Sequence, residues 1–148
     1  MSAAHESEDT EEVGIGRKAR YYERIRAANA SETTEDYVEA IADLIANGGE
    51  ARVADLSKIF GVSHVTVSRT VGRLVRDGLA TTEPYKSIEL TPAGLELAAA
   101  CEARHTIVLR FLLSLGLDEE TAQADAEGIE HHVSPATLAV FERFTNER

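Results

Sequence analysis

Apolar residues recur every three or four positions along most of the chain after residue 30, which is the spacing of amphipathic helices. The first such stretch follows possible N-cap residues between Ser31 and Thr34 and ends at Gly48. A second helix is predicted near Val53 to Phe60, and a third follows a cap at Ser63 and ends at Gly78.

Two short apolar segments, Leu79 to Thr82 and Ile88 to Leu90, flank a turn that contains Pro84. This pattern predicts a β-hairpin. Three helices followed by a hairpin indicate a winged helix-turn-helix. We therefore predict a DNA-binding domain over residues 31–91, here named the winged module.

The remainder, residues 92–148, is predicted to be entirely helical and is here named the helical half. Thr91 and Pro92 begin a long helix that ends at Gly116. Further helices are predicted over Asp118 to Glu130 and, after a cap at Ser134, up to Phe144. The fold class is therefore mainly α. The helical half is too small to be independent and is expected to dimerise through its apolar residues, among them Phe111, Leu112, Leu113, Leu115 and Leu117.

Residues 1–30 differ from the rest in charge pattern. Acidic residues dominate up to Glu12, and basic residues dominate from Arg17 to Arg26, around Tyr21 and Tyr22. We expect an N-terminal arm that is partly disordered. Its basic part fits a short helix, an arm that touches phosphate, or a solvated segment.

A length of 148 residues suits one compact unit or two small subdomains. A single cysteine excludes a disulfide framework, and no long apolar run predicts a membrane span, so a cytoplasmic protein is expected. The net charge of −11 argues at first against nucleic-acid binding. However, residues 51–90 carry six basic and four acidic side chains, so the acidity lies elsewhere.

In a helix-turn-helix, the start of the second helix enters the major groove of double-stranded DNA. Arg69 is suited to a bidentate guanine contact, Val65 and the Thr66 methyl group to thymine, and Ser63 and Lys86 to phosphate. The predicted DNA-binding residues are Ser63, His64, Val65, Thr66, Ser68, Arg69, Arg73 and Lys86. The alternative is a small helical module that contacts protein.

Several carboxylates and imidazoles stand at helical spacing. Glu127, Glu130 and His131 lie at i, i+3 and i+4, Asp36 and Glu39 at i and i+3, and His105 on the apolar side of its helix. Each alone fits a surface acid or a core histidine. Together they form a set of hard oxygen and nitrogen donors that suits Mn²⁺. Without a divalent cation, the negative charges of the carboxylates in this set would repel one another.

Three segments resemble the DtxR family of metal-dependent repressors in its manganese-responsive MntR branch: Glu35 to Glu39, Thr66 to Leu79, and Asp125 to His132. The resemblance implies a homodimer that binds operator DNA and represses metal-uptake genes when loaded with Mn²⁺. It also implies that the metal ligands are Asp36, Glu39, His105, Glu127, Glu130 and His131. Up to two Mn²⁺ ions per subunit are expected, with Fe²⁺ or another divalent metal as the alternative.

The iron-responsive relatives carry Met in place of Asp36, Cys in place of Glu130, and an additional SH3-like domain. Three alternative hypotheses are compatible with the sequence: an iron-responsive regulator, a winged-helix regulator that senses an organic ligand, and a metallohydrolase that uses the same donors. We predict a regulator that is not an enzyme and has no organic cofactor.

Overall fold

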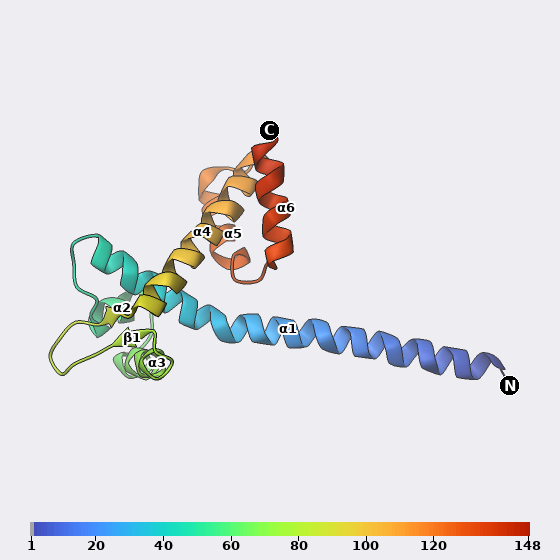
Figure 1. Ribbon diagram of the computed structural model, residues 1–148, viewed down its shortest axis with the longest axis horizontal. Coiled ribbons are helices and arrows are strands. Elements are labelled where there is room, and N and C mark those ends of the chain that lie inside the picture. Colours follow the sequence, from blue (N-terminus) through green and yellow to red (C-terminus); the bar gives the residue numbers. More distant parts are fainter. Residues whose placement is uncertain (1) are drawn as a thin grey trace.

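The computed structural model describes residues 2–148, with side chains from Glu12 onward. The fold is mainly α, as predicted, and Figure 1 shows the arrangement of its elements. In chain order these are α1 (Ser2–Ala46), α2 (Val53–Phe60), α3 (His64–Arg76), β1 (Ala80–Thr81), β2 (Glu89–Leu90), α4 (Pro92–Ser114), α5 (Glu119–Ile129) and α6 (Pro135–Asn146).

Helix α1 begins far earlier than the sequence pattern predicts, and its N-terminal part projects away from the other elements (Figure 1). The cap predicted between Ser31 and Thr34 is wrong, because the Ser31 hydroxyl donates a hydrogen bond to the Ala28 carbonyl inside a continuous helix. No Gly or Pro interrupts residues 17–47, so nothing in the local sequence stops the helix. The domain boundaries at residues 30 and 91 and the partial disorder of the arm stay predictions.

The winged module forms around one apolar core, to which the second half of α1 contributes Tyr37, Val38 and Ile41. Leu56 of α2 and Leu74 of α3 complete its centre, and β1 pairs antiparallel with β2. Two other predicted caps are confirmed: Ser63 accepts a hydrogen bond from the Thr66 backbone N–H, and Thr91 accepts one from the Gly94 backbone N–H.

A second core lies in the helical half, where Val108 and Leu112 of α4 pack against Ala122 and Ala126 of α5. Phe111 stacks on Phe141 of α6 with ring centroids 3.9 Å apart. Leu112 is therefore buried within the chain, contrary to the expectation that it helps to form a dimer surface, whereas Phe111 is half-buried. Leu113, Leu115 and Leu117 do remain exposed.

Candidate metal centre and DNA-binding face

The six predicted metal ligands come from three places in the chain and meet between the two cores. Asp36 and Glu39 lie one turn apart on α1, next to core residues of the winged module. His105 lies on α4, just before the core residue Val108. Glu127 lies on α5, and Glu130 and His131 follow directly after this helix ends. The last turn of α5 packs on α4 through Ala126, and this packing places Glu127 and Glu130 near His105.

Glu130 is the central side chain of this cluster and is fully buried. Its Oε2 lies 3.1 Å from His105 Nδ1, and its Oε1 lies 3.3 Å from His131 Nε2. His131 Nε2 also lies 2.9 Å from Asp36 Oδ1, and His105 Nδ1 lies 3.7 Å from Glu127 Oε1. Three overlapping groups of possible ligand atoms result: Glu32, Asp36 and His131; Glu39, Glu130 and His131; His105, Glu127 and Glu130.

Five buried ligand atoms in this cluster lie close to other ligand atoms, but their geometry forms no hydrogen bond: Glu39 Oε1, His105 Nδ1, both carboxylate oxygens of Glu130, and His131 Nε2. Buried polar atoms without partners are costly, and buried carboxylates without a counter-charge are more costly still. A divalent cation among these atoms would satisfy them at once. The donor set therefore fits the metal that the sequence predicts.

The electrostatics of the cluster indicate that protons occupy it when metal is absent. Burial, together with the charge of Glu130, raises the pKa of Glu39 to about 7. The neighbouring carboxylates of Asp36, Glu130 and Glu35 raise the pKa of His131 to about 11. Burial and the charges of Glu35 and Glu39 raise the pKa of Cys101 to about 12, so this residue stays a thiol at neutral pH in the metal-free protein.

Sequence reasoning missed two acidic residues of α1 beside this cluster. Glu32 stands four residues before Asp36, a spacing that could have revealed it, and its Oε2 lies 3.2 Å from His132 Nε2. Glu35 is 8 % exposed and accepts a hydrogen bond from His131 Nδ1. No sequence signal distinguishes Glu35 from a surface acid, because its partners lie about 70 and 100 residues away along the chain.

Helix α3 presents one buried and one exposed face. Val67, Thr70, Val71 and Leu74 pack into the core of the winged module. The predicted DNA-binding residues of this region, Ser63, His64, Val65, Thr66, Ser68, Arg69 and Arg73, are all exposed. The Ser63 hydroxyl caps α3 and also lies 3.0 Å from the Thr66 hydroxyl. These two exposed side chains therefore also stabilise the N-terminus of the helix.

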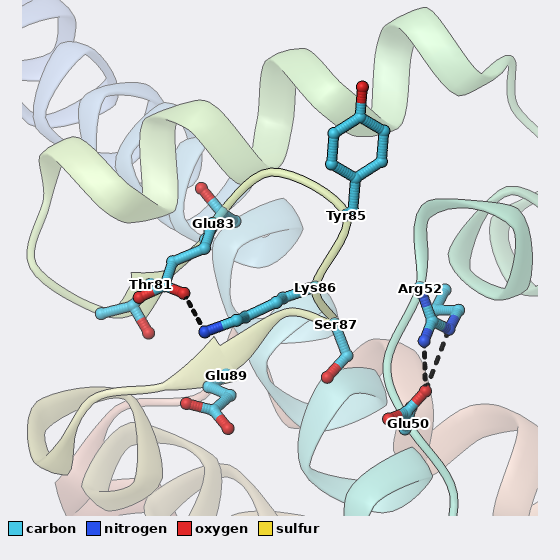
Figure 2. Close-up of a pocket in the computed structure, with 9 residues that line it drawn as sticks. Glu50, Arg52, Thr81, Glu83, Tyr85, Lys86, Ser87 and Glu89 are labelled. Atoms are coloured by element: carbon cyan, nitrogen blue, oxygen red, sulfur yellow. Dashed lines mark hydrogen bonds and ion pairs between the residues drawn. The ribbon is translucent and has the colours of Figure 1, made fainter.

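The loop between β1 and β2 forms the wing, and Figure 2 shows the hollow of about 310 Å³ beneath it. Lys86 forms an ion pair with Glu83 there, and Arg52 forms one with Glu50. Tyr85 lies at the edge of this hollow, is fully exposed and has a positive φ of 63°. Lys86 pairs with Glu83, but its side chain stays 70% exposed, so this pair leaves it accessible as the predicted phosphate contact.

Comparison with known proteins matches two family descriptions to successive parts of the chain. The family description "Iron dependent repressor, N-terminal DNA binding domain" matches residues 29–88, and "Iron dependent repressor, metal binding and dimerisation domain" matches residues 91–147. "Transcriptional regulator MntR" of Salmonella typhimurium is 42% identical over 93% of this chain and 88% of its own length. "HTH-type transcriptional regulator MntR" of Lysinibacillus sphaericus is 42% identical over 68% of this chain and 72% of its own.

Solved structures agree with this result. The manganese regulator SloR has a TM-score of 0.67 at 25% identity, covering 77% of this chain and 54% of its own. A manganese-dependent transcriptional repressor in complex with manganese has a TM-score of 0.67 at 27% identity, covering 76% and 52%. The chain thus spans about half the length of these two structures. Across residues 2–148, no helix combines the length and apolar character that crossing a bilayer requires.

Proposed function

Because the chain belongs to the iron-dependent repressor family, also known as the DtxR family of metal-dependent repressors, we propose that it is a manganese-responsive repressor of metal-uptake genes. The observation that carries this proposal is the group of five buried, unpartnered ligand atoms at the junction of α1, α4 and the end of α5. Carboxylate and imidazole donors without a thiolate suit Mn²⁺. The named relatives are transcriptional regulators, so we assign no catalytic step.

The proposed ligands are Asp36, Glu39, His105, Glu127, Glu130 and His131. Glu130 presents one oxygen to each histidine, so its carboxylate would help to hold up to two Mn²⁺ ions per subunit. The bound metal would supply positive charge that balances the carboxylates. The open hollow of about 430 Å³ between Glu32, Asp36, Glu39 and Glu127 gives metal a route from solvent.

The proposed switch depends on α1, which supplies ligands and also core residues of the winged module. Metal would hold α1 to α4 and α5 and so limit the separations that the two winged modules of a homodimer can adopt. Operator half-sites one helical turn apart require one such separation. The exposed residues of α3 and the wing would then contact operator DNA in the cytoplasm.

The test is a gel-shift titration on the DNA upstream of the chain's own gene and on metal-uptake promoters, with Mn²⁺, with Fe²⁺ and with EDTA. We expect a specific complex with Mn²⁺ that EDTA abolishes. Glu130→Ala should abolish the Mn²⁺ response, whereas Glu142→Ala, an exposed acid of α6, should keep it. Operator binding that neither EDTA nor Glu130→Ala reduces would refute the proposed function. Stronger operator binding with Fe²⁺ than with Mn²⁺ would show that iron is the activating metal.

A further inference from the structure

A buried carboxylate lies behind His131, on the side away from the proposed metal. Glu35 of α1 is not among the proposed ligands, yet its side chain is only 11% exposed. Its Oε2 accepts two hydrogen bonds, one from His131 Nδ1 at 2.6 Å and one from Arg104 Nη2 at 2.5 Å. This contact joins α1, α4 and the segment after α5 at one oxygen atom.

The two nitrogens of His131 therefore face different surroundings. Nε2 faces Asp36 and Glu130 and lacks a hydrogen-bond partner, while Nδ1 faces Glu35. An imidazole binds metal through a nitrogen that carries no proton, so its remaining proton must sit on the other nitrogen. A carboxylate that accepts the Nδ1–H bond favours this tautomer and fixes the plane of the ring.

Arg104 stabilises the buried carboxylate of Glu35. A buried acid is stable only when a counter-charge and hydrogen bonds compensate the loss of water. Arg104 supplies both, and its Nη2 also lies 3.4 Å from Cys101 Sγ, which keeps the guanidinium in position along α4.

On the basis of the proposed function, we propose that Glu35, held by Arg104, is a positioning residue that aims His131 Nε2 at the metal. It acts through His131 and does not bind the ion. The position of Glu35 on α1 also means that the contact exists only while α1 lies against α4 and the end of α5. The Glu35–His131 hydrogen bond thus makes the metal site sensitive to the same helix packing that the switch uses.

The first test is Mn²⁺ affinity of the full chain, followed by the electron paramagnetic resonance signal of free Mn²⁺. Glu35→Met keeps the side-chain size and removes the acceptor, and we expect a loss of about 10- to 100-fold in affinity. The matched control is Glu23→Met, the same change at an exposed site of α1, which should bind like wild type. Equal affinity of Glu35→Met and wild type would overturn the inference.

Because Glu35→Met leaves Arg104 without its partner, the double variant Glu35→Met/Arg104→Met is a second form of the test. It leaves no unpaired charge, and we expect the same loss of Mn²⁺ affinity with cooperative unfolding retained. A double variant that binds Mn²⁺ as tightly as wild type would also overturn the inference. If wild type itself binds no Mn²⁺, the proposed function fails instead, so the two failures are distinguishable.

The second readout is the ¹H–¹⁵N signal of the His131 ring with Zn²⁺ as a diamagnetic probe. In wild type we expect a downfield Nδ1–H resonance that exchanges slowly with water, because a buried carboxylate accepts this proton. Glu35→Met should lose the resonance, and Glu23→Met should keep it. An unchanged resonance in Glu35→Met would show that another group accepts the proton and would overturn the assignment.

Discussion

Mn²⁺ binding should displace protons, because two of the proposed ligands hold protons at neutral or mildly acidic pH in the metal-free protein. The pKa of Glu39 is raised to about 7 by burial and the charge of Glu130, and the pKa of His131 is raised to about 11 by the surrounding carboxylates. Both groups must lose a proton before they can donate electrons to a metal. The apparent Mn²⁺ affinity should therefore rise with pH.

The size of the effect follows from the two pKa values. Below about pH 6.5, both Glu39 and His131 are protonated, so each unit of pH should raise the affinity by about 100-fold. Above about pH 7.5, Glu39 is already ionised and only His131 still holds its proton, so the increase should fall to about tenfold per unit. Each displaced proton corresponds to about 1.4 kcal/mol per pH unit.

Isothermal titration calorimetry in two buffers of different ionisation enthalpy counts the released protons directly. We expect about two protons per bound Mn²⁺ near pH 6 and about one near pH 8. Glu39→Gln should lower the count near pH 6 to about one, whereas Glu142→Gln, which is remote from the cluster, should leave both counts unchanged. Binding that releases no protons at either pH would refute the electrostatic description of the site.

Three further predictions concern DNA, packing and assembly. Arg69→Ala should weaken specific operator binding by about 1–3 kcal/mol and leave Mn²⁺ affinity unchanged, whereas an equal loss on random DNA would make Arg69 a phosphate contact only. Gly94→Ala should destabilise the fold by about 1–3 kcal/mol in urea unfolding, because the added Cβ would lie 2.0 Å from the Leu79 carbonyl oxygen; unchanged stability would contradict this packing. Light scattering at micromolar concentration should give the mass of a dimer, and Leu115→Glu/Leu117→Glu should lower it, since these exposed leucines extend the apolar surface of the helical half. A monomeric wild type would rule out this assembly.

Much of the fold follows from signals that act over a few residues. Hydroxyl and carboxylate caps at Ser63, Thr91, Asp118 and Ser134 set the beginnings of α3, α4, α5 and α6, and each accepts a backbone hydrogen bond three residues later. The spacing of Glu127, Glu130 and His131 likewise indicates three donors on one side of a helix end. Such features are readable from the sequence because the interacting groups lie within one helical turn.

Tertiary structure alone decided which of these local groups meet. The hydrogen bonds of Glu35 reach Arg104 and His131, and the packing of α1 against α4 brings Glu35 and Arg104 together. The same packing buries Glu130 between two histidines. It also buries Glu39, and this burial together with the charge of Glu130 raises the pKa of Glu39. The pairing of Lys86 with Glu83 depends on the bend of the wing in a similar way. Periodicity identifies the face that a helix buries, whereas the partner on that face depends on the packing of the whole chain, because burial and Coulomb interaction act between groups that are distant in sequence.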